Sequence, residues 1–298
     1  MQTFKAIVES NQEYEVTEPD FKIACKVNRE LEKDGSYYGV CPHCDGPVQL
    51  IGLYIKKETK QRPYARHALS DIDGVADRTI ATGYCPLNTH RKVFDPEEKM
   101  AVVTTHSVLM FKAIIEYWNE ILFIIRQEYG IYISEKREIE ILNSIKKAKV
   151  WLYPYVDLRN LPWVILYRIP IEDLIFKWIR KDSELYNVLV SKGIKLEKKN
   201  DNYYQVVKQD KYFNWNYRFD GFMQKVVDDE IVDSIEECVI EEIKEEPGYI
   251  EHYSNVKTIN RNRFYNLIHS EKALSNPKRA EKQKLARDIL GEPPVPNE

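Results

Sequence analysis

The sequence predicts a mixed α+β fold in three regions, and changes of pattern along the chain divide them. Residues 1–94 hold short runs of alternating polarity and three closely spaced cysteines, which indicates a β-rich region. Residues 95–246 hold long helical patterns followed by strand patterns, which indicates an α+β core with a β-meander. Residues 247–298 are charged and poor in apolar side chains, which predicts an extended helical C-terminal arm.

Composition and charge are those of an ordinary globular chain. Of the 298 residues, 31% are charged and 43% are apolar, and the formal net charge of −3 gives no overall attraction to nucleic acid. No apolar run is long enough to span a bilayer, and residues 1–5 lack a secretory pattern. Five cysteines in such a chain predict thiols in a reducing cytoplasm.

In the first region, residues 4–8 and 21–25 are predicted to be short strands. Residues 36–40 and 48–54 predict a hairpin whose tip carries Cys41 and Cys44. Pro42 stiffens the tip, and Asp45-Gly46 allows the chain to fold back. A thiol pair on a strand hairpin is typical of the first half of a zinc ribbon, so this region is expected to be zinc-ribbon-like.

Cys41, Cys44, His67 and Cys85 are the predicted ligands of one structural zinc ion. Zinc prefers thiolates and imidazoles in a tetrahedron, and a structural site leaves no position for water. His90 is an alternative to His67, and His43 is expected to point to solvent. Two other interpretations remain: a redox pair, which normally begins a helix in a βαβ unit, or buried thiols without a metal.

The core is predicted to open with a long helix. Asp95-Pro96-Glu97-Glu98 is typical of a helix start, and the apolar spacing then continues to about Gly130. A second helix is expected from Ser134 to about Val150. Further along we expect a buried strand at 163–168, helix in two pieces over 171–193, strands at 194–198, 203–207 and 212–227, and a helix at 230–245, where a strand is the alternative.

After Pro247-Gly248 the chain turns basic, and its sparse apolar residues predict two helices without a core of their own. Such a segment either reaches for a partner or a second copy, or packs against its own body. Aromatic and arginine side chains are the usual anchors of an interface. The candidate partner-binding residues are therefore Tyr249, Tyr253, Arg263, Phe264 and Tyr265.

The motifs of the common enzyme classes are missing. The sequence has no G-x-x-x-x-G-K-[ST] or G-x-G-x-x-G loop, no H-E-x-x-H helix and no G-x-S-x-G elbow. The cysteines and histidine best placed for a nucleophile are already assigned to the metal. We therefore expect a protein that is not an enzyme.

Two resemblances add to this interpretation. The stretch with YGVCPHC and PYARH resembles the N-terminal zinc ribbon of CoiA-like competence proteins, which implies a nucleic-acid-binding protein or a degenerate nuclease. The whole chain resembles phage-encoded anti-defence proteins that inhibit the bacterial Gabija complex, in its size, its cysteine-containing N-terminal body and its charged C-terminal arm. The second resemblance implies stoichiometric binding of a bacterial defence complex in the host cytoplasm, homo-oligomers on that target, and neither membrane contact nor direct binding of nucleic acid.

Overall fold

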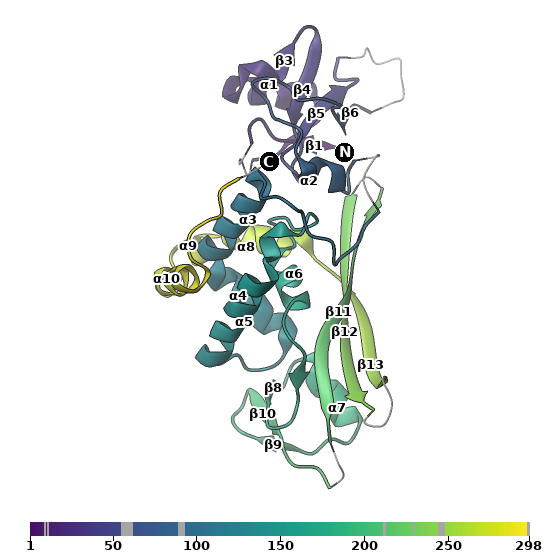
Figure 1. Cartoon of the computed structure of the whole chain (residues 1–298), viewed down its shortest axis with the longest axis vertical. Helices are drawn as coiled ribbons and strands as arrows, with labels where there is room; N and C mark the ends of the chain where they lie inside the picture. The colour runs from purple at the N-terminus through teal and green to yellow at the C-terminus, as the bar shows by residue number, and fades with distance from the viewer. Residues whose placement is uncertain are drawn as a thin grey trace.

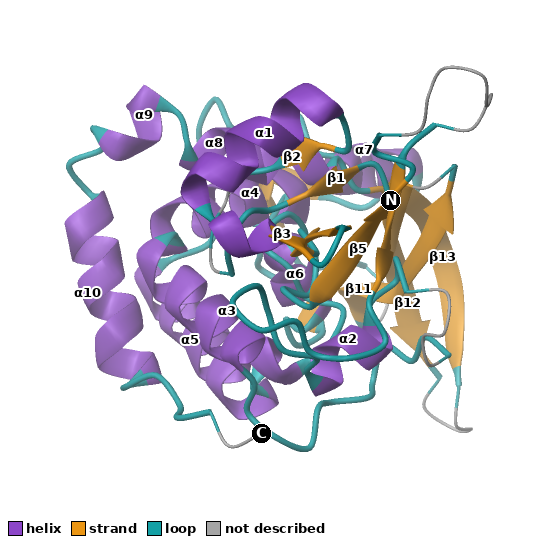
Figure 2. Cartoon of the chain, turned by 90° about the horizontal axis from the view of Figure 1, so that it is seen from above, coloured by secondary structure: helices purple, strands orange, loops and turns teal. Residues whose placement is uncertain are grey.

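The structure is a computed structural model that describes residues 1–8, 10, 12–54, 62–88, 93–210, 213–228, 230–243 and 248–296. The N-terminal β-rich region lies at one end of an elongated molecule, and the helices and the long meander lie side by side below it (Figure 1). Seen from above, most helices gather on one side and the strands on the other (Figure 2). The predicted α+β fold is confirmed. Two clusters of buried apolar side chains form, one within residues 1–100 and one within residues 110–290.

Short antiparallel strands build the N-terminal region. The predicted hairpin is confirmed, because β4 and β5 pair in the register Tyr38↔Gln49 and Val40↔Pro47. A four-stranded sheet has the order β3-β4-β5-β6, and β1 pairs with β2. The elements are β1 Thr3–Phe4, β2 Tyr14–Glu15, α1 Glu18–Val27, η1 Arg29–Leu31, β3 Glu32–Lys33, β4 Ser36–Val40, β5 Pro47–Ile51, β6 Tyr64–His67 and α2 Ile80–Tyr84.

The strand predicted at residues 21–25 is wrong, because this segment belongs to helix α1. Thr17 caps the helix by accepting a hydrogen bond from the Asp20 N–H, and Pro19 lies in the first turn. Phe21 and Ala24, three positions apart, form the buried face. The strand predicted at residues 4–8 shrinks to the end of β1.

The first of the central helices begins later than predicted. The central helices are α3 Thr105–Glu116, α4 Trp118–Tyr129, α5 Glu135–Ala148, η2 Val150–Leu152 and α6 Leu161–Tyr167. Thr104, not Asp95, caps α3. The Asp95 carboxylate instead accepts a hydrogen bond from the Glu97 N–H at 2.8 Å and closes a turn. The start of α5 at Ser134 is confirmed.

Residues 163–168 form helix α6 and not the predicted strand. Its six residues from Leu161 to Leu166 are all buried. A short apolar run does not by itself distinguish a buried strand from a buried helix. Pro162 in the first turn is the sequence signal that favours the helix.

A long three-stranded meander forms the other side of the molecule. Sheet orders are β13-β12-β11-β7 and β8-β10-β9. The helix predicted at 230–245 is wrong: β12 is a strand, and Asp233, Ile235, Glu237 and Val239 are buried at every second position. The elements are β7 Glu172–Asp173, β8 Trp178–Arg180, α7 Glu184–Ser191, β9 Leu196–Lys198, β10 Tyr203–Val206, β11 Trp215–Val227, β12 Glu230–Glu242 and β13 Tyr249–Thr258.

These bounds settle two further predictions. Of the two helical pieces predicted over residues 171–193, only the second exists, as α7, because strands β7 and β8 occupy the first half. The strands predicted around residues 194–198, 203–207 and 212–227 are confirmed as β9, β10 and β11.

The C-terminal segment packs on the body, so the predicted extended arm is wrong and its packed alternative holds. β13 is the outer strand of the meander. Helices α8 Arg261–Ile268, α9 Glu271–Leu274 and α10 Arg279–Leu290 follow, and α10 packs against α3, α4 and α5 (Figures 1 and 2). Phe264 and Ile268 of α8 and Ala286 and Leu290 of α10 join the central core. Within the part of the chain that is described, no helix is long and apolar enough to cross a bilayer.

Candidate metal centre and the adjoining cleft

The four predicted metal ligands meet at one point of the N-terminal region. Cys41 and Cys44 lie in the loop between β4 and β5, His67 ends β6, and Cys85 follows α2. The ligand atoms of the four residues all lie within 4.8 Å of one another. Side chains 23 to 44 positions apart in sequence are thus brought together by the hairpin and its neighbours.

The distances match a tetrahedral zinc site. The Cys41 and Cys85 sulfurs are 3.8 Å apart, and the Cys44 sulfur is 3.3 Å from His67 Nε2. In a tetrahedral zinc site with bonds of about 2.3 Å to sulfur and about 2.0 Å to nitrogen, two sulfurs lie about 3.8 Å apart, and a sulfur and a nitrogen lie about 3.5 Å apart. The cluster could therefore hold a structural metal ion such as zinc.

The loop backbone is shaped to present the two sulfurs. The Cys41 N–H donates to the Gly46 carbonyl at 2.8 Å, and the Asp45 N–H donates to the Cys41 carbonyl at 3.1 Å. Asp45 has a positive φ of 58°, a conformation that aspartate and asparagine adopt more readily than most residues. A Cβ on Gly46 would lie 2.4 Å from Thr82 Oγ1, so glycine is required where α2 approaches the loop.

Burial makes the three thiols hard to ionise together. It raises the pKa of Cys44 and of Cys85 well above the usual range. Burial acts the same way on Cys41, but hydrogen bonds from the other two thiols outweigh it and hold the pKa of Cys41 low. A buried cation is what would let all three become thiolates, which is the chemistry of a closed metal site.

The imidazole of the set is His67. Its Nε2 is the nitrogen that faces the sulfurs. Its Nδ1 is buried and has no hydrogen-bond partner among the described residues. The alternative ligand, His90, lies outside the described residues. With three sulfurs and one nitrogen, the donor set is complete without water, as in structural zinc sites.

His43 does not point to solvent as predicted. It is only 4% exposed, and its Nδ1 lies 2.6 Å from Asp157 Oδ2 in the loop before α6. Asp45, two residues on, forms an ion pair with Lys5, and its Oδ2 lies 3.6 Å from His106 Nδ1 on α3. The loop therefore directs Cys41 and Cys44 toward the metal site and His43 and Asp45 toward the body.

Asp157 is the centre of a buried polar network. Arg261, the first residue of α8, forms ion pairs with both Asp157 and Asp233. Burial disfavours a charged Asp157, but the charges of Arg261 and His43 hold its pKa well below the usual range. Burial raises the pKa of Asp233, which the same guanidinium offsets only in part. This network joins the ribbon, the core and the C-terminal segment.

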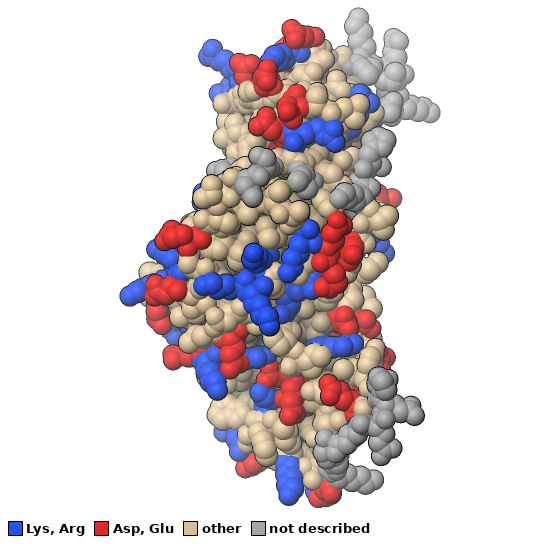
Figure 3. All heavy atoms as spheres, viewed as in Figure 1, with Lys and Arg blue, Asp and Glu red and all other residues tan. Residues whose placement is uncertain are grey.

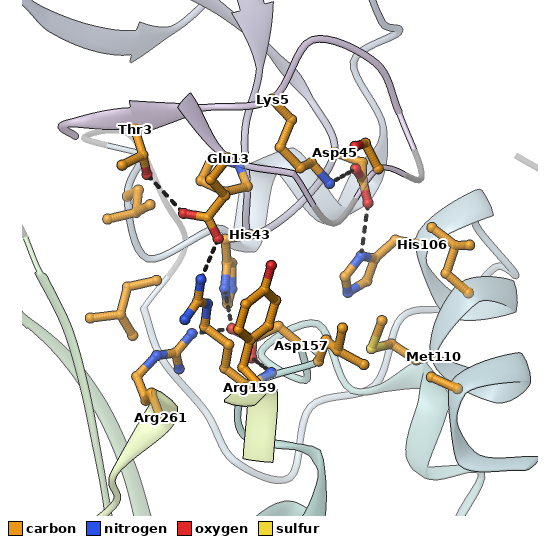
Figure 4. A pocket seen from close by; sticks show the side chains of 18 of the residues that line it. Thr3, Lys5, Glu13, His43, Asp45, His106, Met110, Asp157, Arg159 and Arg261 are labelled. Carbon is orange, nitrogen blue, oxygen red and sulfur yellow. Dashed lines mark hydrogen bonds and ion pairs between the residues drawn. The ribbon is translucent and has the colours of Figure 1, made fainter. Parts of the chain in front are cut away.

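A cleft of about 590 Å³ opens at this junction, between the ribbon, α3 and the start of α8 (Figure 4). His43, Asp45, His106, Asp157 and Arg261 are among the residues that line it. Sequence reasoning missed this site. Its residues are single side chains from distant segments, and the one local signal is that His43 and Asp45 each adjoin Cys44, one of the candidate metal ligands.

The five predicted partner-binding residues do not form one surface. Phe264 is fully buried in the core, so it is unavailable to a partner in this structure. Arg263 forms an ion pair with Glu128, and the Tyr265 ring lies 4.2 Å from the Arg159 guanidinium. Tyr253 on β13 donates a hydrogen bond to Glu184. Of the five residues, only Tyr249, on the same strand, is strongly exposed, at 50%.

Comparison with known proteins assigns no family. A scan of protein-family models found no match, and neither did searches of curated proteins and of solved structures.

Proposed function

We propose that the protein is a non-catalytic binding protein, stabilised by one structural zinc ion at Cys41, Cys44, His67 and Cys85, that inhibits a bacterial defence complex of the Gabija type. It acts in the host cytoplasm, where several copies bind the complex stoichiometrically and block its access to DNA. The resemblance in size and organisation suggests the class of target. The observation that carries a binding role is an exposed group of aromatic side chains at the end of the molecule opposite the ribbon.

This aromatic surface consists of Tyr132, Trp178 and Tyr203, and the exposed Phe176 lies two residues before Trp178 in the chain. The Tyr132 ring centroid lies 5.6 Å from that of Trp178 and 5.5 Å from that of Tyr203. Tyr132 is 48% exposed, Phe176 60% and Trp178 37%. Aromatic side chains exposed together on one surface are the composition of an interface centre.

Phe176 is held in an unusual conformation. Its φ of 63° lies in the left-handed region, which costs a residue with a side chain about 1–2 kcal/mol. The Phe176 N–H donates to the Val206 carbonyl at 2.9 Å, and the Leu174 beside it is fully buried. A strained, exposed and well-anchored phenylalanine fits a binding surface, where pre-organisation reduces the entropy lost on association.

The charges near the aromatic surface favour a protein as the partner. Three basic side chains of the surrounding segments are paired within the chain: Lys177 with Glu172, Arg180 with Asp182, and Lys199 with Glu197. A nucleic acid needs free cations for its phosphates. In Figure 3, acidic and basic side chains are interspersed over the lower part of the face, whereas basic side chains gather across its middle.

Titration of the target tests the proposal. Purified protein should pull down the defence complex and inhibit its nuclease activity in proportion to the inhibitor-to-target ratio. Replacing Trp178 and Phe176 by Ala should weaken binding by at least about tenfold, as for interface anchors. Phe123→Ala is a matched control, because Phe123 is an equally exposed aromatic on α4.

Three results would contradict the proposal. Full inhibition at a small fraction of the target concentration would show turnover. Unchanged binding by the Trp178 and Phe176 variant would remove the aromatic surface from the interface. Salt-sensitive binding to DNA without any protein target would favour the zinc-ribbon nucleic-acid protein instead.

A further inference from the structure

Strand β13, the outer strand of the meander, has one edge without a neighbour among the described strands. Its sheet has the order β13-β12-β11-β7. Figures 1 and 2 show β13 at the outside of the molecule. An open edge presents main-chain donors and acceptors to other chains, so proteins usually protect it with charge, with proline or with a bulge.

The hydrogen bonds to β12 identify the residues of β13 that face the open edge. The Ile259 N–H donates to the Asp233 carbonyl at 2.8 Å, and the same register continues back to Tyr253. Because bonded and non-bonded pairs alternate along an antiparallel ladder, every second residue from Ile259 to Tyr253 bonds to β12. The residues between them direct their N–H and C=O groups to the open edge, and these edge residues are Ser254, Val256 and Thr258.

The edge residues lack the usual protection against pairing. All three are exposed, Val256 by 64%, and none is charged or a proline. A shift of register opposite Val239 and Ile240 places a bulge at His252, so it disturbs the strand only before the edge residues. The charge that lies between them, on Lys257, forms an ion pair with the buried Glu237 of β12.

The edge residues are complementary to themselves in one antiparallel register. If Val256 lies opposite Val256 of a second copy, Ser254 lies opposite Thr258, and all three edge residues have a partner. A shift by two residues in either direction leaves one of them without a partner. Three such pairs exchange about six main-chain hydrogen bonds. Serine–threonine and β-branched pairs are favourable across strands, and this register places no like charges opposite each other.

We propose that two copies of the protein form a twofold dimer by antiparallel pairing of their β13 strands, with Val256 at the twofold axis. The two meanders then form one continuous sheet. A twofold contact uses the same surface of both copies, which the self-complementary register provides. The proposed function places several copies on one target, and this dimer is the contact that joins two of them. The pairing rests on the proposed function only for the role of the dimer, because it also concerns the free protein.

Analytical ultracentrifugation of the full-length, metal-loaded protein without any target tests the pairing. The native protein should sediment as a dimer at micromolar concentrations. Val256→Lys should raise the dissociation constant of the dimer at least about tenfold, because two like charges then lie directly opposite each other. Ile250→Lys is the matched control and should dimerise as the native protein does, because Ile250 is 50% exposed on the same strand but lies on the other side of the bulge.

An exchange of charge tests the register itself. Val256→Glu should weaken the dimer as Val256→Lys does, whereas an equimolar mixture of the two variants should restore it, because a lysine then lies opposite a glutamate. Val256→Pro is a second way to block the edge. It removes an N–H that points away from β12, a position at which an edge strand tolerates proline, so this variant should lose the dimer and keep the native circular dichroism spectrum.

The proposal is overturned if the native protein is a monomer at these concentrations, if Val256→Lys dimerises as the native protein does, or if the mixture of Lys and Glu variants does not restore the dimer. If Val256→Lys dimerises normally but no longer binds the defence complex, the edge pairs with a strand of the target instead. These measurements do not depend on inhibition. A native dimer that inhibits no defence complex would therefore refute the proposed function and leave the pairing intact.

Discussion

Four consecutive residues, Cys41 to Cys44, together with Asp45, serve two different surfaces at once. The cysteines face the metal site, whereas His43 and Asp45 are buried against Asp157 and His106 of the body. The loop is a tight turn, closed by the hydrogen bond from the Cys41 N–H to the Gly46 carbonyl, so its successive side chains leave it in different directions and one short loop can serve both surfaces. The geometry of the metal site and the docking of the ribbon are therefore linked residue by residue.

Removing one sulfur should remove the metal. We expect about one zinc ion per chain in protein prepared without chelator, as four closed ligands imply. Cys44→Ser should lose it and lower the melting temperature by about 10 °C, because metal binding contributes to folding free energy. Elemental analysis and thermal unfolding measure both effects. Cys25→Ser is the matched control, since Cys25 lies on α1 outside the cluster, and equal zinc in both variants would refute the site.

Asp45→Asn should destabilise the protein more at pH 6 than at pH 9. Burial lowers the pKa of His106, but the nearby Asp45 carboxylate outweighs it and raises the pKa above its usual value. A raised histidine pKa gives stability that is complete below the unfolded pKa of about 6.5 and is lost as pH rises through the folded pKa.

Asparagine is the suitable replacement because it tolerates the positive φ of Asp45. The expected loss is about 2–4 kcal/mol at pH 6, and it includes the loss of the ion pair between Asp45 and Lys5. Denaturant unfolding at the two pH values measures the difference. A loss that is the same at both would show that His106 stays neutral.

At the scale of elements, the C-terminal helices are part of the central core. Their apolar residues are few but lie four apart, at Phe264 and Ile268 and again at Ala286 and Leu290, so each helix has one narrow buried stripe. Lys282 on α10 donates to the buried Glu138 at 2.7 Å. A segment too poor in apolar residues to fold alone can still complete a core supplied by other helices.

A chain that ends after residue 278 should therefore be unstable. It loses α10, uncovers the apolar surface of α3, α4 and α5, and leaves Glu138 without Lys282. Breaking a buried ion pair alone costs about 3–5 kcal/mol, so the melting temperature should fall by about 10 °C or more. A chain that ends after Gly291 is the control and should melt as the full chain does. Equal melting of both truncations would mean that α10 is only a solvated tail.

At the scale of the whole molecule, the buried network couples the metal site to the C-terminal segment. The path runs from the metal-binding loop through His43 to Asp157 and on to Arg261 at the start of α8. Among the described residues the two clusters of fully buried apolar side chains are separate, although the partly buried Phe94 packs against the second one. The buried polar contacts therefore add to a small apolar contact between the two parts.

Chelation of the metal should accordingly loosen α8 as well as the ribbon. Amide hydrogen exchange should rise in β4 and β5 and also in α8, whereas β8 to β10, at the far end, should exchange as before. Asp157→Asn, with the metal retained, should raise exchange in α8 without affecting β4. Chelation that affects only the ribbon would show that the two ends of the network are independent.

Local pattern determined the elements whose signal is contained in neighbouring residues: the β4–β5 hairpin, the cap of α5 at Ser134, the meander strands β9 to β11, and the Cys41–Cys44 pair of the candidate metal site. Cysteine and histidine identify a metal site because few other roles need those residue types so close together. Tertiary structure alone decided the elements whose apolar runs are compatible with either a helix or a strand, such as α6 and β12. Whether such a run is buried on one side or all round selects between helix and strand, and that depends on the surrounding elements.

Tertiary structure also decided the packing of the C-terminal segment, the burial of His43, and the cleft. Each depends on a residue from a distant segment: Glu138 for α10, Asp157 for His43, and Arg261 for Asp157 and Asp233. A charged side chain has the same local sequence pattern whether it lies in water or in a buried ion pair. The fold decides between these two environments by bringing an oppositely charged partner from a distant segment. Only such a partner offsets the free-energy cost of removing the charge from water.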